Sequence, residues 1–230
     1  DWVVAGRGMT VGEIGGLEVA VVVSPMGLVN NAISAQALFD AFEPDALVSI
    51  GMAGGLQLEP GETFYASRVV QHDKGTIEAY GQVWSPIPRD PRIEFGWMAD
   101  GIAEVLGGAG VTSGTLVSGS QFIKSAKKRD ALVTKFDASA VDMQGSALAA
   151  VAEQNGVPIL ILRTISDRAD SGARASFQDF AERGGADEVD WLLRLLDTWQ
   201  SMIFPSAQLS RPAARPYIRV AAAWPSSPTS

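Results

Sequence analysis

Two hydrophobic patterns alternate along the N-terminal part of the chain. Leu17 to Ser24 is nearly continuous in apolar and β-branched residues, which is typical of a strand that is covered on both faces. From Leu28 to Phe42 the apolar residues recur at spacings of three and four, which predicts a helix with one apolar face. Ala46 to Ile50 is a second short apolar run. Strand, helix and strand in this order predict a parallel βαβ unit with a right-handed crossover.

Further apolar runs and helical spacings follow toward the C-terminus. Strands are expected over Phe64–Gln71 and Val111–Val117, and helices over Arg92–Leu106, Ser125–Thr134 and Arg174–Met202. Ala140 to Asp167 has the pattern of a strand end, a small-residue helix, a tight turn and a second buried strand. Helices that alternate with buried strands predict an α/β fold.

The last stretch of the chain has a different composition. Five of the 12 prolines lie after Phe204, together with several serines. We therefore expect a single domain over residues 1–203 and a Pro/Ser-rich tail over residues 204–230 that is disordered or loosely wrapped.

Composition excludes several classes of function. The net charge of -8 argues against a surface that binds nucleic acid. The chain has no cysteine and a single histidine, His72, so thiolate and histidine-rich metal sites are excluded, and we expect neither a metal nor a cofactor. No apolar run reaches the length of a membrane span and no signal peptide is evident, so we expect a cytoplasmic protein without a membrane partner.

Several glycine-rich or polar segments follow the predicted strands and should meet at one edge of the sheet. They are Gly51–Gly55, His72-Asp73, Ser118–Ile123, and Met143 with Asp167. Gly51–Gly55 would let the backbone approach a ligand closely, although it lacks the spacing of a dinucleotide-binding loop and the lysine of a P-loop. Together the segments offer hydroxyls, amides, carboxylates, one aromatic ring and one thioether. Such a mixture suits a small ligand that is partly apolar and partly hydroxylated.

Six stretches of the sequence, taken together, resemble the nucleoside phosphorylase/nucleosidase superfamily, and most closely its 5'-methylthioadenosine/S-adenosylhomocysteine nucleosidase branch. They are Ser49–Leu56, His72-Asp73, Val117–Ile123, Val141–Gly145, Gly156–Pro158 and Arg163–Asp170. The resemblance implies a three-layer α/β/α fold with a central mixed, mostly parallel sheet. It also implies cleavage of an N-glycosidic bond in a nucleoside, and assembly into a homodimer or a larger homo-oligomer.

The resemblance assigns the catalytic acid to the Ser-Asp pair at the end of the last stretch. Asp167 would protonate the purine leaving group, and Ser166 would orient the carboxyl group. A carboxylic acid can do this at neutral pH only if burial raises its pKa. The plainer alternative is that Ser166 or Asp167 caps the helix that follows.

Four further residues would contact the nucleoside if the resemblance holds. Phe122 would stack on the base, and the backbone of Ile123 would hydrogen-bond the edge of the base. Met143 would pack against the ribose, and Arg163 would lie near the sugar pocket. As alternatives, Phe122, Ile123 and Met143 are core residues, and Arg163 forms an ion pair with Asp142.

The sequence departs from the family pattern in three places. The family usually has a glutamate where this chain has Gln144, and loss of that charged acceptor for the ribose hydroxyls would cost on the order of 1.5–3 kcal/mol. Met52, which with Ala53 and Gly54 is expected to line the substrate site, stands where many members have Ser or Thr, and it cannot donate to phosphate. The carboxylate that helps activate water in the hydrolases follows a first strand that would precede Asp1.

These observations favour a nucleosidase that hydrolyses a purine nucleoside, expected to be a 5'-substituted adenosine. A phosphate-dependent nucleoside phosphorylase is the enzymatic alternative. Because Gln144 is neutral, a catalytically weak nucleoside-binding protein is a second alternative, and a scaffold subunit that keeps the fold for oligomerisation is a third.

Overall fold

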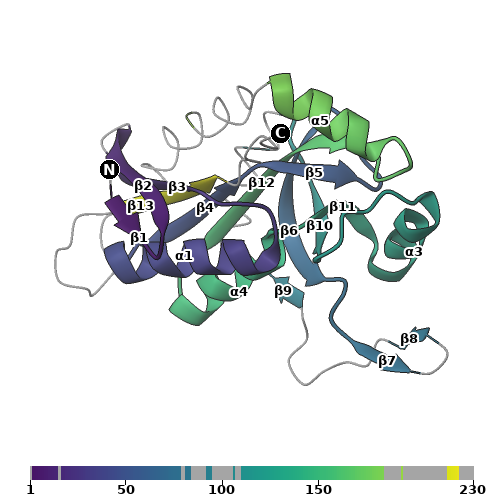
Figure 1. The fold of residues 1–230 in the computed structure, drawn as a ribbon, viewed down its shortest axis with the longest axis horizontal. Coiled ribbons are helices and arrows are strands. Elements are labelled where there is room, and N and C mark those ends of the chain that lie inside the picture. The colour runs from purple at the N-terminus through teal and green to yellow at the C-terminus, as the bar shows by residue number, and fades with distance from the viewer. Residues whose placement is uncertain are drawn as a thin grey trace.

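The computed structural model describes residues 2–14, 17–78, 81–83, 92–94, 110–183 and 217–222, together with Leu106 and Leu193. In these parts the helices are α1 (Leu28–Phe42), α3 (Ala126–Phe136), α4 (Gly145–Asn155) and α5 (Ala173–Arg183). The strands are β1 (Trp2–Val4), β2 (Arg7–Ile14), β3 (Leu17–Val23), β4 (Ala46–Ile50), β5 (Met52–Gly55), β6 (Thr63–Gln71), β7 (Thr76–Glu78), β8 (Gly81–Val83), β9 (Arg92–Glu94), β10 (Thr112–Ser118), β11 (Ala138–Asp142), β12 (Ile159–Asp167) and β13 (Tyr217–Ala222). Figure 1 shows their arrangement.

The described strands, apart from the small β7–β8 pair, form one mixed sheet in the order β1-β2-β3-β13-β4-β12-β5-β11-β10-β6-β9. Strands β3, β13, β4 and β12 run parallel, whereas β5 and β11 pair antiparallel. An additional antiparallel pairing of β12 with β6 closes β12, β5, β11, β10 and β6 into a ring. The predicted α/β class and the mixed sheet are therefore confirmed, but the ring of strands is barrel-like and the three-layer arrangement is not confirmed.

The predicted βαβ unit needs one correction. β3 and β4 are parallel to each other, with α1 between them in the chain, but they are not neighbours in the sheet. β13 lies between them and pairs with both, with Ala222 opposite Val23 on one side and Ile50 on the other. Among the described strands, β13 is therefore what joins β3 to β4 by hydrogen bonds.

This position also corrects the prediction for the C-terminal stretch. Residues 217–222 were expected to belong to a disordered or loosely wrapped tail, and instead they form an internal strand of the sheet. The other residues of 204–230 lie outside the described part of the chain, and the boundary between domain and tail stays a prediction.

The helix expected over Arg92–Leu106 is also wrong at its start. Arg92–Glu94 is strand β9, which pairs antiparallel with β6. Leu106 is helical, and the residues between Glu94 and Leu106 lie outside the described part. Spacing of apolar residues alone did not separate an edge strand from a helix here.

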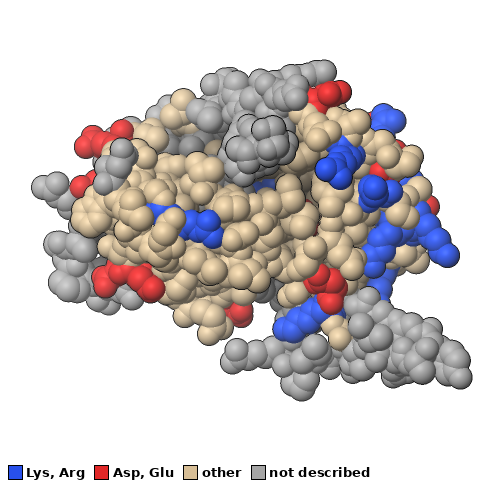
Figure 2. All heavy atoms as spheres, in the orientation of Figure 1, with Lys and Arg blue, Asp and Glu red and all other residues tan. Residues whose placement is uncertain are grey.

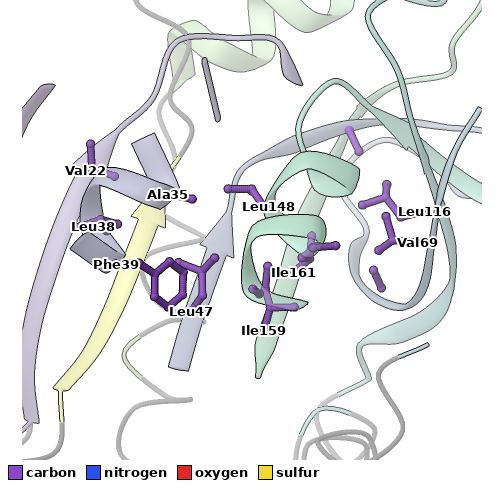
Figure 3. Packing of buried hydrophobic residues seen from close by; sticks show 14 of the residues in the cluster. Val22, Ala35, Leu38, Phe39, Leu47, Val69, Leu116, Leu148, Ile159 and Ile161 are labelled. Carbon is purple, nitrogen blue, oxygen red and sulfur yellow. The ribbon is translucent and has the colours of Figure 1, made fainter. Parts of the chain in front are cut away.

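A buried cluster between the helices and the sheet fixes the strands whose ends carry the polar loops. Figure 3 shows Leu38 and Phe39 of α1, Leu148 of α4, and Ile159 and Ile161 of β12 among its members. These side chains are at most 5% exposed. Full burial of one such side chain contributes about 1.5–3 kcal/mol, so this cluster is a main source of stability.

Leu38 gives a direct measure of that contribution. Its side chain is fully buried on α1, so Leu38→Ala should lower the free energy of unfolding by about 2–5 kcal/mol in urea denaturation. Val3 on β1 is 77% exposed, and Val3→Ala is the control with an expected change within about 0.5 kcal/mol. Equal effects of the two substitutions would contradict the packing shown in Figure 3.

Basic side chains gather over α3, as Figure 2 shows on the side of the molecule where that helix lies. Lys124, Lys127, Lys128 and Arg129 surround its first turns, and Ser125 caps it by accepting a hydrogen bond from the backbone N–H of Lys128. All four side chains come from one short segment of the sequence. They form a local positive cluster on a chain whose net charge is -8.

Candidate active site

One pocket opens near the carboxyl ends of the strands and gathers most of the predicted site residues. The predicted residues in its lining are Met52, Ala53, Gly54, Phe122, Ile123, Met143, Gln144, Ser166 and Asp167. Met26, Gln121, Val141, Asp142 and Phe177 complete the lining. Arg163 is the predicted site residue that does not reach the pocket surface. Of the segments predicted to converge, Gly51–Gly55, Ser118–Ile123 and Met143 with Asp167 contribute to the pocket lining, whereas His72-Asp73 does not.

Asp167 ends β12 and is only 3% exposed. Ser166 Oγ lies 2.8 Å from Asp167 Oδ2, and the backbone N–H of Ala169 donates to Asp167 Oδ1 at 2.8 Å. Burial raises the pKa of Asp167, and the negative charge of Asp170 adds to the rise, while the hydrogen bonds from Ala169 and Ser166 oppose it. A carboxyl group with a raised pKa at a pocket wall has the property that a general acid needs.

Neither half of the Ser-Asp pair is explained by capping alone. Asp167 does accept a backbone N–H, from Ala169, but its nearest helix, α5, begins only at Ala173. Ser166 Oγ lies 3.2 Å from the carbonyl oxygen of Ala53 on the neighbouring strand β5. A Cβ on Gly54 would lie 3.0 Å from Asp167 Oδ1, so a glycine lets β5 pass close to the carboxyl group.

Arg163 and Asp142 form a fully buried ion pair behind the pocket. Arg163 Nε donates to Asp142 Oδ2 at 3.0 Å, and both side chains are at most 1% exposed. Arg163 Nη1 also donates to Ser49 Oγ at 3.0 Å and to the carbonyl oxygen of Leu162 at 2.7 Å. Of the two sequence interpretations of Arg163, the structure supports pairing with Asp142 rather than contact with the sugar.

Asp142 also organises the start of α4. Its Oδ1 accepts from Ser118 Oγ at 2.5 Å and from the backbone N–H of Gln144 at 3.2 Å, and both oxygens accept from the N–H of Gly145 at 3.0–3.1 Å. Ser118 Oγ in turn accepts the backbone N–H of Ser146 at 2.9 Å. This network ties the ends of β10 and β11 to the helix that begins beside the pocket.

Gln144 lines the pocket at this helix start and is 9% exposed. Its side-chain Oε1 is buried and has no hydrogen-bond partner in the part of the chain that the structure describes. An acceptor in that position can bond a hydroxyl group of a ligand, but it carries no charge. Gln144 therefore contributes a neutral acceptor to the pocket lining.

The opposite wall of the pocket is more apolar. Phe122 is 37% exposed and meets Phe177 of α5 edge-on, with ring centroids 5.8 Å apart. Phe122 is therefore not a core residue. Ile123 is 7% exposed and packs with Leu56 in a buried cluster, so its side chain belongs to the core while its segment borders the pocket.

Two residues of the pocket lining lie outside the six stretches that the sequence singled out. Phe177 reaches the pocket from α5, and Met26 reaches it from the turn after β3. Apolar residues are common in turns after buried strands and on the inner faces of helices. The residue types of Met26 and Phe177 therefore do not indicate a ligand. The only signal for Met26 was its place directly after a predicted buried strand.

Metal ligands do not cluster in the described residues, since no group of three His, Cys, Asp or Glu side chains is close enough to hold an ion. No helix within the described ranges is long and apolar enough to cross a membrane.

The sequence model of the phosphorylase superfamily matches residues 3–197. The chain belongs to the phosphorylase superfamily. Among curated relatives, it is 31% identical over 190 residues to the 5'-methylthioadenosine/S-adenosylhomocysteine nucleosidase of Exiguobacterium sp., covering 79% of this chain and 81% of that protein. It is also 31% identical over 186 residues to the aminodeoxyfutalosine nucleosidase of Helicobacter pylori, covering 78% and 80%.

Solved structures agree with this membership. A Helicobacter pylori nucleosidase mutant with 5'-methylthioadenosine in its active site superposes with a TM-score of 0.77 at 29% identity, covering 84% of this chain and 86% of that one. The Streptococcus pneumoniae nucleosidase with a transition-state inhibitor gives 0.76 at 28% identity, covering 86% and 89%. The resemblance inferred from six short stretches is thus confirmed over most of the chain.

Proposed function

We propose that this protein hydrolyses the N-glycosidic bond of a purine nucleoside and that the substrate is a 5'-substituted adenosine. The observation that carries the proposal is the buried carboxyl group of Asp167, whose pKa is raised, on the wall of a pocket that also holds an exposed aromatic ring and a buried acceptor. The Exiguobacterium relative is a nucleosidase of 5'-methylthioadenosine and S-adenosylhomocysteine, and this supports the substrate class.

In the proposed reaction Asp167 donates its proton to a purine ring nitrogen while the bond from the ribose carbon to the base breaks. The bonding electrons leave with the base, and the ribose carbon becomes cation-like until water adds to it. The added water loses a proton to the solvent, and Asp167 takes up a proton again before the next turnover. Phe122 stacks on the base, the Ile123 backbone bonds its edge, and Met143 packs against the sugar. Gln144 Oε1 accepts from a ribose hydroxyl.

Hydrolysis is preferred over phosphorolysis because of the charges around the pocket. The described lining contains no Lys, Arg or His side chain, and Met52 has no proton to donate to phosphate. Arg163 is held by Asp142. A phosphate ion would therefore lack a cationic partner among these residues.

The proposal is tested by incubating the protein with 5'-methylthioadenosine, S-adenosylhomocysteine, adenosine and inosine, with and without phosphate, and measuring free base. Release of adenine from the 5'-substituted nucleosides without phosphate is the expected result. Release that requires phosphate would replace hydrolysis by phosphorolysis. Tight binding without release would favour the nucleoside-binding protein, for which the neutral Gln144 is the specific observation.

Gln144→Glu should raise kcat/KM for base release. The new carboxylate would stabilise the cation-like ribose, and a charged acceptor is worth on the order of 1.5–3 kcal/mol, which is about a tenfold to hundredfold gain. Gln121 lines the same pocket, so Gln121→Glu is the matched control and should leave kcat/KM nearly unchanged. Unchanged activity in Gln144→Glu would show that this position does not contact the reacting sugar.

The cellular setting is part of the proposal. We place the protein in the cytoplasm as a homodimer or larger homo-oligomer, and the three-layer arrangement expected from the family likewise stays a proposal. Val29 and Ile33, one turn apart on α1 and close in sequence to the pocket residue Met26, are 72% and 43% exposed, which supports a covered face in an oligomer. Sedimentation velocity at micromolar concentration measures the oligomeric state.

A further inference from the structure

A short turn, Ser118–Ser120, connects the end of β10 to the pocket segment Gln121–Ile123, and it is fixed at every residue. The backbone N–H of His72 donates to the carbonyl oxygen of Ser118 at 2.9 Å. The N–H of Gly119 donates to the carbonyl oxygen of Asp142 at 3.2 Å, and the N–H of Ser120 donates to Asp73 Oδ2 at 2.7 Å. The turn is thus held by His72 and Asp73 on one side and by β11 on the other.

The imidazole ring of His72 fills the space beside the middle residue of this turn. The ring is 1% exposed, and a Cβ placed on Gly119 would lie 2.3 Å from Nε2 and 2.6 Å from Cε1. The backbone of Gly119 is not in the left-handed region, so its conformation does not demand glycine. The ring itself leaves no room for a side chain at position 119.

The contact depends on the shape of the ring rather than on hydrogen bonds. Neither ring nitrogen of His72 has a partner among the residues that the structure describes. Burial lowers the pKa of His72; the charge of Lys128 lowers it further, whereas those of Asp73 and Asp142 raise it. The ring also does not line the pocket, so it does not touch the ligand.

We propose that His72 is a positioning residue: its ring sets the place of the Ser118–Ser120 turn and, through that turn, the place of Phe122 and Ile123 against the base. The identity of the base as the ligand rests on the proposed function, whereas the coupling of His72 to the turn does not. Asp167 comes from β12, a different strand, so a shifted turn should weaken binding of the base more than it slows proton transfer.

The test is a double-mutant cycle of His72→Ala and Gly119→Ala. With His72 present, Gly119→Ala should displace the turn and raise KM by about tenfold or more, the size expected for overpacking, with a smaller change in kcat. With His72→Ala, the ring is gone and the same Gly119→Ala substitution should cause no further loss, because the new Cβ occupies the freed space. Gly12→Ala is the matched control, since no atom lies within 4 Å of its Cβ position.

Hydrogen–deuterium exchange of the peptide spanning residues 118–123 gives a readout without ligand. Faster exchange at Ser120 in Gly119→Ala, reversed in the double variant, supports the proposal even if no base is released and the proposed function fails. Equal and additive effects of Gly119→Ala in both backgrounds, or exchange that neither substitution changes, would overturn it.

Discussion

Asp167→Asn should lower the rate of base release by about 10²–10⁴-fold, the usual contribution of a positioned general acid. Asparagine keeps the shape of the side chain and can still accept from the N–H of Ala169, so the pocket should remain intact. KM should therefore change little while kcat falls. Stopped assays of free adenine, with equilibrium binding of 5'-methylthioadenosine as the check on folding, measure both effects.

The pH dependence of the reaction identifies the same group. Asp167 acts in its protonated form, so activity should fall as the pH rises through its raised pKa, and this alkaline limb should vanish in Asp167→Asn. Folding stability depends on pH in the same direction as activity. The pKa of Asp167 is raised above 3.8, so the contribution of this group to folding is complete below that pH and is lost as the pH rises through the folded-state pKa.

Asp170 supplies the matched control. It is a neighbouring carboxylate whose charge raises the pKa of Asp167. Asp170→Asn should keep most of the activity and move the alkaline limb to lower pH. If base release survives Asp167→Asn at the wild-type rate, the acid has been assigned to the wrong residue.

Features that depend on neighbouring residues could be predicted from the sequence. The apolar runs at Leu17–Ser24 and Ala46–Ile50 were correctly predicted as buried strands, and β12 is buried along its whole length. Ser166 and Asp167 are the last residues of β12, and Phe122 lies four residues after the end of β10. β10 is parallel to β6, whereas β6 is antiparallel to β12, so the two segments meet because the strands close into a ring and not because all of them are parallel. Local pattern was sufficient for the strands, and the resemblance supplied the site residues.

Features that depend on distant pairing could not be predicted in the same way. Tyr217–Ala222 lies among prolines and serines, and nothing local shows that β3 and β4 leave a position between them for it. Phe177 is one apolar residue on an amphipathic helix until the fold brings it to Phe122. Arg163 had two sequence interpretations, and complete burial beside Asp142 decided between them.

Arg163→Met should lower the free energy of unfolding by about 3–5 kcal/mol, because it leaves the buried charge of Asp142 without its partner. The Asp142 side chain is 1% exposed, so solvent compensates little for loss of the guanidinium group. The other donors to Asp142, Ser118 Oγ and the N–H groups of Gln144 and Gly145, are neutral. Urea denaturation monitored by tryptophan fluorescence measures the loss.

Arg168 provides a control of the same residue type five positions further along. It pairs with Glu59 at the surface, where the two side chains are 59% and 66% exposed. Arg168→Met should cost no more than about 1 kcal/mol, as is usual for exposed ion pairs. A similar cost for the two arginines would contradict the importance of burial at Arg163.

The double variant Arg163→Met/Asp142→Asn separates loss of the pair from loss of packing. It removes both charges, so it should be more stable than Arg163→Met alone, and together with the single variant Asp142→Asn it completes the cycle that measures the coupling between the two residues. The amide that replaces the Asp142 carboxylate retains an oxygen that can accept from the N–H groups at the start of α4, so the helix and Gln144 should keep their places beside the pocket. Nucleoside binding should then recover together with stability, whereas a double variant as unstable as Arg163→Met would show that the arginine acts through its bonds to Ser49 and Leu162 instead.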